Sequence, residues 1–379
     1  MRIGIIAPEF PPDVGGVETY SYEFSCELAR RGHDVYVFTR PHVEGELSGS
    51  SIHVLPELTR RYLKDRFLLK SHSMDVWHVM NAAYAWLALE VRPVVVSVHG
   101  NDFIDPYFLP IAPDLPRGFG LWRLHKRIAP LYSSLWKRWA LRSMGRGLQH
   151  ATHVIANSQY TKEKLLERHP GSAAISSVGY VGVGAEFFQM EHQPNGLAAD
   201  KRFLTVCRLA DARKNIDKIL HALAQLRRFA FRYTIVGDGN LRSELEILCH
   251  QLKLDDRVHF TGFIPKTEMQ KLLASSDLFI LPSAVMPDSI EGFGIAYLEA
   301  NACGTPVLAA RCAGAAEAVD EGKTGYFVES PTVPALAQAL EQFLVGDIVF
   351  KGEHCREFAA RFTWAKVVDR AMPYYMTAV

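Results

Sequence analysis

The sequence predicts an α/β protein with two parallel β-sheets, each covered by helices. Short apolar runs rich in β-branched residues alternate with helical patterns along the chain, which is typical of parallel sheets. The alternation restarts near Phe203, after a glycine-rich stretch over residues 179–200 that has little periodicity. The length of 379 residues is ample for two cores, because domains typically hold about 100–200 residues each. We therefore expect an amino-terminal domain over 1–185, a carboxyl-terminal domain over 186–365, and a final segment, 366–379, that packs back on the first domain.

The amino-terminal half begins with a strand, a loop and a helix. A compact apolar run is followed by a loop that contains proline and glycine, and then by a helical pattern that Gly32 ends. Further short, β-branched runs extend the same parallel sheet. The expected strands are residues 2–7, 34–39, 94–98 and 153–156, and the expected helix is residues 17–31.

The carboxyl-terminal half carries the clearer alternation of strands and helices. Each short apolar run is followed by an amphipathic stretch long enough to cross back over a sheet. The expected strands are residues 203–208, 233–236, 258–261, 278–281 and 306–309, and the expected helices are 216–227, 241–252, 266–275 and 295–302.

Composition excludes several classes of protein. The net charge of +1, with 48% hydrophobic and 22% charged residues, is that of an ordinary globular protein and not of a general polyanion binder. The six cysteines contain no Cys-x-x-Cys pair, and no Asp-x-Asp or clustered His/Cys/Asp/Glu spacing occurs, so we expect no metal and no cofactor. The start lacks a secretory h-region, and no apolar stretch reaches about 18 residues, so a cytoplasmic protein is expected.

Two glycine turns are candidate ligand contacts. Gly15 and Gly16 lie between the first expected strand and helix, where the absence of side chains and the helix amino terminus suit a phosphate or a sugar. Gly237 follows a later strand in the same way. Ordinary turn geometry is the alternative explanation for both.

Two cations follow the first strand of the second half. Arg208 and Lys214 lie near the carboxyl end of a parallel strand, where ligands bind in such sheets. Two fixed positive charges suit a diphosphate, although two solvated surface charges would give the same pattern.

The most specific motif runs from residue 291 to residue 300. Phe293, Gly294 and Ile295 precede or begin a helix and present backbone amides that suit an anion. Glu299 lies in an apolar stretch of that helix and suits the paired hydroxyls of a ribose, whereas Glu291 suits a hexose. Solvated glutamates on a helix face are the alternative.

A histidine ends an apolar strand in the first half. His99 follows residues 94–98 and precedes Gly100, so its ring can face a crevice and contact a sugar or a leaving phosphate. A structural histidine at a strand end is the alternative.

Together these motifs resemble glycosyltransferase family 4, whose members are retaining enzymes of the GT-B fold, over nearly the whole chain. Cys207 stands where the family often has glycine, and Gly184 replaces an aspartate of the family's linker motif. The matching motifs are Gly15-Gly16-Val17-Glu18, His99-Gly100 with Asp102, Ser158 with Thr161, Arg208 with Lys214, Gly237-Asp238-Gly239, Val258-x-Phe260-x-Gly262, the two glutamates 291 and 299, and Ala302-Cys303-Gly304-Thr305-Pro306-Val307.

The resemblance implies two facing Rossmann-like domains with an interdomain cleft, and a nucleotide-sugar donor that needs no metal. Retention would come from attack on the face of the departing diphosphate, with a donor phosphate oxygen taking the acceptor proton. The likeness to bacterial mannosyl- and rhamnosyltransferases of surface polysaccharides favours a GDP-linked mannose or deoxymannose and a glycan or lipid-linked acceptor. It assigns catalytic roles to His99, Glu291, Arg208 and Lys214, and donor binding to Gly15, Gly16, Gly237, Phe293, Gly294, Ile295 and Glu299.

A basic aromatic stretch over residues 115–150 indicates contact with an anionic membrane surface. It contains eight cations and no acidic residue, interleaved with tryptophan and tyrosine. A second patch near Arg60, which includes Tyr62 and Phe67, is expected on the same face. Nucleic-acid binding is disfavoured because no recognition motif accompanies the charges. A solvated helix whose tryptophans pack into the domain is the alternative. The cations are Arg117, Arg123, Lys126, Arg127, Lys137, Arg138, Arg142 and Arg146.

Other functions remain as alternatives. A non-catalytic nucleotide-sugar-binding or partner-binding protein would be expected to lose one of the motif residues, and none is missing. A transferase with a UDP-sugar and a soluble acceptor fits the same motifs. A dehydrogenase is disfavoured because the Gly-x-Gly-x-x-Gly fingerprint with a later acidic residue is absent after the first strand.

Overall fold

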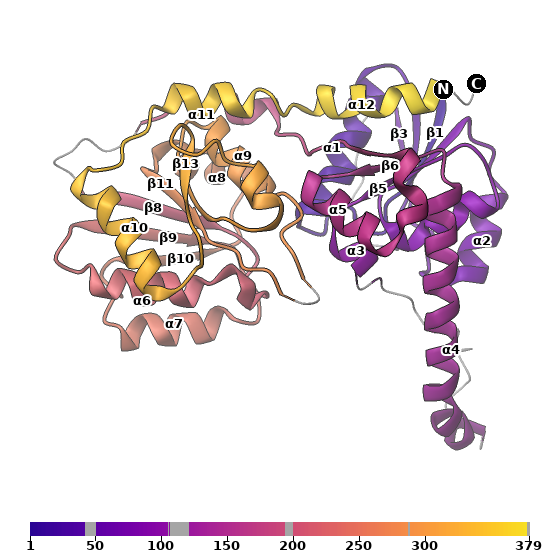
Figure 1. Ribbon diagram of the computed structural model, residues 1–379, viewed down its shortest axis with the longest axis horizontal. Helices are drawn as coiled ribbons and strands as arrows, with labels where there is room; N and C mark the ends of the chain where they lie inside the picture. Colours follow the sequence, from indigo (N-terminus) through magenta and orange to yellow (C-terminus); the bar gives the residue numbers. More distant parts are fainter. Residues whose placement is uncertain (42–50, 105, 107–120, 194–199, 287–288, 377–379) are drawn as a thin grey trace. The chain divides into compact units, whose positions relative to one another are not determined.

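A computed structural model describes residues 1–41, 51–104, 106, 121–193, 200–286 and 289–376, and side chains of helix α4, Leu121–His150, from residue 134 onward. The chain forms two compact units (Figure 1). Unit 1 contains Met1–Gly179 and the chain from Val368, and unit 2 is Tyr180–Val367. The boundaries therefore follow Gly179 and Val367.

Unit 1 contains a parallel sheet with helices on its faces (Figure 1). Its seven strands lie in the order β3-β2-β1-β4-β5-β6-β7. The strands are β1 Arg2–Ile6, β2 Asp34–Phe38, β3 Ile52–Leu55, β4 Val76–Val79, β5 Val94–Val98, β6 His153–Ala156 and β7 Ser176–Val178. The helices are α1 Gly16–Arg30, α2 Tyr62–Lys70, η1 Ala82–Leu89, α3 Asn101–Ile104, α4 Leu121–His150, α5 Gln159–Arg168 and η2 Pro170–Ile175.

Burial explains why the central strands of unit 1 are so apolar. Every residue of β4, β5 and β6 is buried, as expected for parallel strands covered on both faces. Ser158 caps α5, since its Oγ accepts a hydrogen bond from the Thr161 amide at 2.9 Å. The predicted strands over 94–98 and 153–156 are confirmed as β5 and β6.

Unit 2 contains a second parallel sheet, with six strands in the order β10-β9-β8-β11-β12-β13. The strands are β8 Lys201–Val206, β9 Phe231–Val236, β10 Val258–Gly262, β11 Leu278–Leu281, β12 Val307–Ala310 and β13 Gly325–Val328. The helices are η3 Ala185–Gln189, η4 Ala212–Lys214, α6 Ile216–Gln225, α7 Arg242–Gln251, α8 Lys266–Ser275, α9 Ile295–Ala302, η5 Ala313–Glu317, α10 Val333–Val345, α11 Gly352–Ala359 and α12 Trp364–Met376.

The alternation predicted for the second half is confirmed, with one correction beside the expected site. Helices α8 and α9 and strand β11 have the predicted bounds. Strand β8, predicted to reach Arg208, ends at Val206. The Leu209 amide donates to the Asp238 carbonyl at 2.9 Å, so the chain crosses toward the loop after β9 and leaves the regular ladder.

Helix α12 begins in unit 2 and continues into unit 1, because the unit boundary follows Val367. In unit 1, the Tyr375 hydroxyl hydrogen-bonds Nδ1 of buried His78. Asp369 pairs with Arg31 at 2.7 Å. The end of the chain is therefore part of the structure of unit 1.

None of the helices in the described part of the chain is long and apolar enough to span a membrane.

Candidate active site

Each sheet reverses its strand order at one point, and the candidate residues follow the strands at that point. In unit 1 the reversal lies between β1 and β4, and in unit 2 between β8 and β11. Loops at the carboxyl ends of strands beside such a reversal form the ligand crevice of open parallel sheets. The topology therefore directs attention to the loops after β1, β4, β8 and β11.

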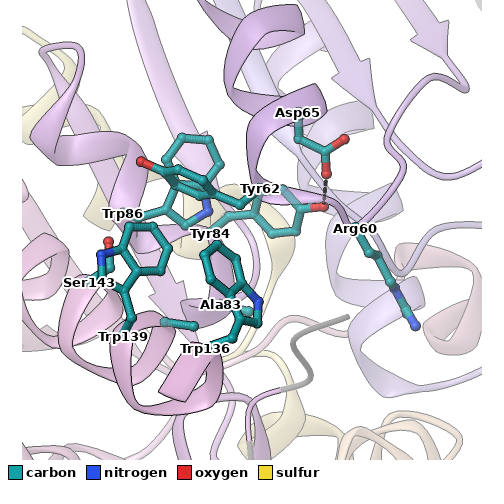
Figure 2. Close-up of a pocket in the computed structure, with 10 residues that line it drawn as sticks. Arg60, Tyr62, Asp65, Ala83, Tyr84, Trp86, Trp136, Trp139 and Ser143 are labelled. Atoms are coloured by element: carbon teal, nitrogen blue, oxygen red, sulfur yellow. Dashed lines mark hydrogen bonds between the residues drawn. The ribbon is translucent and has the colours of Figure 1, made fainter. Parts of the chain in front are cut away.

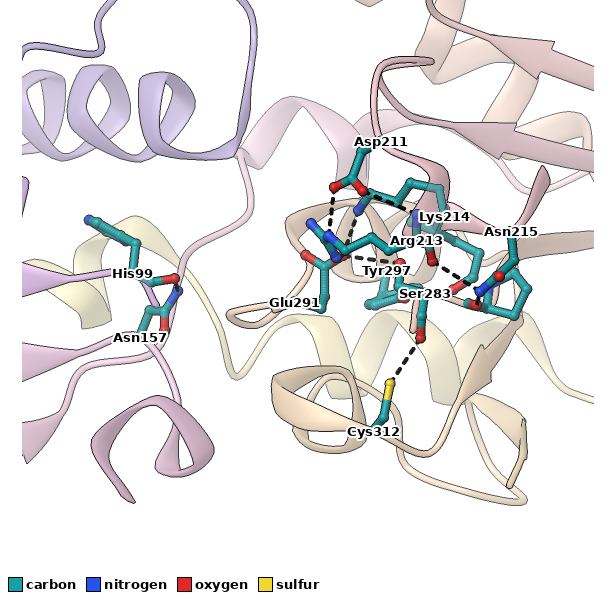
Figure 3. Close-up of polar contacts among 12 residues, drawn as sticks. His99, Asn157, Asp211, Arg213, Lys214, Asn215, Ser283, Glu291, Tyr297 and Cys312 are labelled. Atoms are coloured by element: carbon teal, nitrogen blue, oxygen red, sulfur yellow. Dashed lines mark hydrogen bonds and ion pairs between the residues drawn. The ribbon is translucent and has the colours of Figure 1, made fainter. Parts of the chain in front are cut away.

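In unit 2, Glu291 is the centre of a cluster of charged side chains (Figure 3). Its Oε2 atom accepts hydrogen bonds from Lys214 Nζ at 2.5 Å, Arg213 Nη1 at 3.0 Å and Ser283 Oγ at 3.1 Å. The side chains of Glu291 and Arg213 are only 12% and 9% exposed, so the ion pairs are shielded from water. A shielded pair is stronger than a surface pair, because the effective dielectric is lower.

The cluster holds Glu291 ionised. Burial on its own would raise the pKa of this carboxyl, but the charges of Lys214 and Arg213 outweigh burial and lower it to about 2. Burial alone would lower the pKa of Arg213, whereas Glu291 and Asp211 raise it above its ordinary value. Both partners are therefore charged across the neutral range.

The backbone around the cluster is fixed by Asn215 and Asp211. Asn215 is left-handed, with φ of 55°, a conformation that asparagine tolerates better than most residues. Its side-chain amide donates to the carbonyls of Arg213 at 3.0 Å and Pro282 at 2.7 Å, which joins the loops after β8 and β11. Asp211 caps the short helix η4 and pairs with Arg213 Nε at 2.6 Å.

Lys214 and Glu291, assigned from sequence to different parts of a donor, form one ion pair. Arg208 lies in the same loop, is exposed and makes no ion pair with any described residue. Arg213 was not predicted, although it is the more buried cation and lies next to Lys214. The only feature of the sequence that pointed to Arg213 was its place next to Lys214.

The residues before and within α9 have distinct surroundings. Gly294 caps the helix with φ of 94°, and a side chain there would collide with the Tyr297 ring. Phe293 is buried, whereas Ile295, the first residue of the helix, and Glu299 are half-buried. The helix therefore begins next to Glu291, with Glu299 just over one turn inside it.

The surroundings of Gly237 supply a structural reason for a glycine at this position. The prediction that its backbone approaches a ligand stays a prediction, and within unit 2 its close neighbour is the chain itself. A Cβ on Gly237 would lie 1.9 Å from the Cys207 carbonyl oxygen, and φ is 129°. Glycine is required here to pack the loop after β9 against the chain that leaves β8.

In unit 1, His99 lies among groups that fix its backbone and ring. Its amide donates to Asp102 Oδ1 at 2.9 Å, and Asp102 Oδ2 accepts from the Ala82 amide at 2.9 Å. The Tyr20 ring packs edge-on against the imidazole, with the two ring centroids 4.6 Å apart. The Asn157 side-chain amide donates to the His99 carbonyl at 3.4 Å. The loops after β4, β5 and β6 thus meet at this histidine.

The imidazole of His99 is neutral at physiological pH. Burial lowers its pKa to about 4, against a smaller opposing effect of the Met80 backbone. Its Nε2 atom is buried and has no hydrogen-bond partner among the described residues. Such a ring nitrogen costs free energy in the folded protein, which is characteristic of a group that meets a ligand.

Asp102 is part of the sequence motif that contains His99, but no role was predicted for it from the sequence. Burial raises its pKa to about 6, against hydrogen bonds from the Ala82 and His99 amides. The carboxylate holds together the Ala82 amide, which follows β4, and the His99 amide, which follows β5.

The glycines before α1 differ from each other. A Cβ on Gly15 would overlap the carboxylate of Glu18, whereas a Cβ on Gly16 would meet no atom within 4 Å. A larger residue at position 15 would have to displace the Glu18 carboxylate, whereas Gly16, the first residue of α1, leaves open space.

No group of three or more His, Cys, Asp or Glu side chains within the described ranges could hold a metal ion. The charged groups that are brought together in unit 2 suit an anion instead, through cations and helix amides.

Comparison with known proteins gives the family. A model described as Glycosyltransferase Family 4 matches residues 14–184, and one described as Glycosyl transferases group 1 matches residues 188–361. A GDP-mannose-dependent alpha-(1-6)-phosphatidylinositol monomannoside mannosyltransferase of Mycolicibacterium smegmatis is 29% identical over 375 residues, which cover 91% of this chain and 88% of that protein.

Solved structures agree in fold. Sucrose-phosphate synthase from Thermosynechococcus elongatus matches with a TM-score of 0.75 and 20% identity, over 99% of this chain and 98% of that one. HepE from Anabaena, in complex with UDP-glucose, matches with a TM-score of 0.72 and 20% identity over 100% of both chains. The two parallel-sheet units, the two family models and these likenesses together establish that the chain belongs to glycosyltransferase family 4 and is a glycosyltransferase of glycan biosynthesis with the GT-B fold.

Proposed function

We propose that this glycosyltransferase transfers a hexose, mannose or a deoxymannose, from a GDP-linked donor to a lipid-linked or polysaccharide acceptor of the cell envelope, with retention of configuration. The observation that carries the proposal is the buried ion cluster of Glu291 with Lys214 and Arg213 at the carboxyl edge of the unit 2 sheet. The mannosyltransferase of Mycolicibacterium smegmatis supports the donor and a lipid acceptor, because its name states both.

The cluster suits a donor diphosphate. A diphosphate carries more negative charge than one carboxylate, so it competes with Glu291 for Lys214 and Arg213. Exposed Arg208 and the amides at the start of α9 add further positive potential. Glu291 then accepts hydrogen bonds from hexose hydroxyls, and Glu299 accepts them from the ribose diol.

His99 and the leaving diphosphate complete the proposed chemistry. A neutral imidazole with an available Nε2 atom donates to or accepts from a sugar hydroxyl without a charge that would repel the cations of the site. The bond from the anomeric carbon to the diphosphate breaks as the acceptor oxygen attacks on the same face. A diphosphate oxygen takes the acceptor proton, so no separate protein base is required.

The donor is tested first by thermal shift with GDP, UDP and ADP, because a ligand that binds the native state raises the unfolding temperature. We expect the largest rise with GDP. Transfer from GDP-mannose to an extracted lipid acceptor, with the product linkage assigned by NMR, then tests sugar and stereochemistry. A response to none of the three nucleotides would reject a nucleotide-sugar donor, and a β-linked product from an α-linked donor would reject retention.

A UDP-sugar with a soluble acceptor is the second candidate, because the similar HepE structure was solved with UDP-glucose. A larger thermal shift with UDP than with GDP would favour it. A non-catalytic binding protein would respond to nucleotide and give no transfer or donor hydrolysis.

We also propose peripheral attachment of unit 1 to the inner face of an anionic membrane. In the described half of α4, exposed cations follow one another at helical spacing. Trp139, on the same helix, is 40% exposed, which provides apolar contact beside the charge. Arg117 and the side chains of Arg123, Lys126 and Arg127 lie outside the described residues. The described cations are Lys137, Arg138, Arg142 and Arg146.

Vesicle sedimentation tests the attachment. Electrostatic binding weakens with salt, because the Debye length falls from about 10 Å at 0.1 M to about 3 Å at 1 M. We expect binding to phosphatidylglycerol vesicles that decreases with salt and with Arg138→Ser, Arg142→Ser and Arg146→Ser combined. A triple change of lysines outside α4, Lys164→Ser, Lys253→Ser and Lys323→Ser, is the charge-matched control. Equal binding of the two variants would reject this role for α4.

A further inference from the structure

The core of unit 1 contains buried polar side chains of two kinds, those that bond to near neighbours and those that link distant elements. In the first kind, Asp65 of α2 accepts a hydrogen bond from the hydroxyl of Tyr84 in η1 at 2.7 Å, within a cluster of aromatic side chains (Figure 2). Asp65 also accepts from the Thr59 amide at 2.8 Å, so this group is satisfied locally. The second kind links four elements and ends beside His99.

A series of buried hydrogen bonds leads from helix α12 to helix α1 through two strands of the sheet. The Tyr375 hydroxyl of α12 hydrogen-bonds Nδ1 of His78 in β4. Nε2 of His78 hydrogen-bonds the Ser97 hydroxyl of β5 at 2.8 Å. The Ser97 hydroxyl also hydrogen-bonds the hydroxyl of Tyr20 in α1 at 3.3 Å. These four residues form the polar network, and each is at most 2% exposed, so water does not compete with its bonds.

The polar network is uncharged at physiological pH. Burial lowers the pKa of His78 to about 3 and raises the pKa of Tyr20 to about 12. Burial also raises the pKa of Tyr375. A neutral imidazole has one donor nitrogen and one acceptor nitrogen, so the direction of the Tyr375 bond fixes the direction of the Ser97 bond. The bonds of the polar network therefore depend on one another.

The Tyr20 end of the polar network supports the imidazole of His99. The two rings pack edge-on with centroids 4.6 Å apart. The Tyr20 hydroxyl is held by Ser97, which lies two residues before His99 in the sequence. The Tyr20 ring also stacks on Phe24, whose own ring meets His78 edge-on at 5.0 Å. The polar network and Phe24 thus fix the Tyr20 ring, and this ring limits the orientations that the His99 imidazole can adopt.

Docking of α12 on unit 1 has contacts outside the polar network. Asp369 pairs with Arg31 at 2.7 Å, and the Tyr374 ring stacks on the His153 ring with centroids 3.4 Å apart. Burial of polar groups costs free energy unless their hydrogen bonds are made, so an apolar residue facing an apolar strand would suffice for docking alone. A hydroxyl at Tyr375 bonded to a buried histidine is therefore more than docking requires.

We propose that Tyr375 is a positioning residue for sugar transfer, which sets the orientation of the His99 imidazole. It acts through hydrogen bonds to His78 and Ser97, which hold the Tyr20 ring in place. The proposal rests on the proposed role of His99 in transfer and adds that helix α12 contributes to it. The residues assigned to the donor diphosphate lie in unit 2, so the polar network should act on turnover and not on nucleotide affinity.

Two substitutions interrupt the polar network at different points. Tyr375→Phe removes the hydroxyl at one end, whereas Ser97→Ala breaks the middle and leaves the bond between Tyr375 and His78. Each should lower kcat with GDP-mannose about tenfold or more, because a small misplacement of a group at the reacting centre is costly. GDP affinity by titration calorimetry should remain within about twofold of the parent, since only the turnover step is affected. Tyr374→Phe removes a hydroxyl from the neighbouring residue and is the matched control, with parent-like turnover.

A double variant and a spectroscopic measurement separate positioning from a general structural defect. If both residues act through one network, Tyr375→Phe combined with Ser97→Ala should lower kcat no further than either change alone. Imidazole NMR resonances of isotope-labelled histidine report on the ring directly, and the His99 signals are assigned by their loss in His99→Ala. These signals should shift in both single variants and stay unchanged in Tyr374→Phe. Circular dichroism confirms that each variant is folded.

Three results would overturn the proposal. They are parent-like turnover in Tyr375→Phe, a loss of turnover without a shift of the His99 resonances, and additive losses in the double variant. The proposed function fails in a different way, through a parent that transfers no sugar or a His99→Ala variant as active as the parent. In that case the resonances still decide whether the polar network orients the ring, and unshifted resonances would reject the network as well.

Discussion

Replacement of Glu291 by glutamine should destabilise the protein, and the pKa of the Glu291 carboxyl allows the size of the loss to be calculated. The pKa of this carboxyl is about 2 against an ordinary 4.5. Each pKa unit corresponds to about 1.4 kcal/mol, so the folded protein stabilises the charged carboxylate by about 3 kcal/mol. A buried pair that loses one partner costs about 3–5 kcal/mol, in the same range. We expect Glu291→Gln to lower the free energy of unfolding by about 3 kcal/mol and the unfolding temperature by roughly 6–12 °C.

The pH dependence of the loss gives a sharper test than its size. A depressed carboxyl pKa stabilises the fold fully above the unfolded value, and this stabilisation disappears as pH falls from 4.5 toward 2. The difference between Glu291→Gln and the parent should therefore shrink over that window. Glu321→Gln removes a surface partner of Arg311 and should cost less than about 1 kcal/mol.

Urea denaturation, followed by tryptophan fluorescence, measures both quantities. GDP affinity of Glu291→Gln should stay within a few fold of the parent, because Lys214 and Arg213 remain for the diphosphate, whereas turnover should fall at least a hundredfold. An unchanged unfolding midpoint at neutral pH would show that the ion pairs contribute nothing. An equal loss of GDP affinity and turnover would contradict the assignment of Glu291 to the sugar.

Three further outcomes are expected. Glu299→Ala should weaken free GDP at least tenfold by calorimetry, more than Glu291→Gln does, and equal effects would refute the ribose assignment. Transfer should survive EDTA, and activity restored only by magnesium or manganese would overturn metal independence. Burial lowers the pKa of His99 to about 4 and the pKa of His78 to about 3. As pH falls, these two histidines therefore bind protons at a higher pH in the unfolded chain than in the folded protein. The contribution of the two neutral histidines to the free energy of unfolding should be complete above pH 6.5 and should decrease toward pH 4. The raised pKa of Asp102 partly offsets this loss, because the folded protein binds that proton more tightly than the unfolded chain does. A flat urea midpoint between about pH 7 and pH 4 would contradict this.

Local sequence patterns predicted nine of the thirteen strands in the described residues and indicated part of the site, whereas β3, β4, β7 and β13 were not predicted. The β-branched runs predicted β5, β6 and β11 because fully buried parallel strands require continuous apolar residues. The same logic isolated Glu291, which precedes a mostly apolar helix, and Glu299, which lies within it.

Contacts between residues that are far apart in the sequence could not be predicted from the local sequence pattern. Arg213 pairs with Glu291 only because β8 and β11 are neighbours in the sheet, and the residues are 78 positions apart. The role of Asp102 depends on the Ala82 amide from the loop after β4. The close packing of Gly237 against the Cys207 carbonyl could not be predicted either, because a glycine that packs against backbone has the same local pattern as one that faces a ligand.

The discontinuity of unit 1 has a consequence for synthesis on the ribosome. Unit 2 is one uninterrupted segment inserted into unit 1, so all of its strands have been made while unit 1 still lacks the chain from Val368. Buried His78 gains its Tyr375 partner only after all of unit 2 has been translated. Unit 2 can therefore mature first, despite being second in sequence. A fragment that stops at Gly179 leaves His78 without that partner, whereas a circular permutant that places the final helix ahead of Met1 retains it.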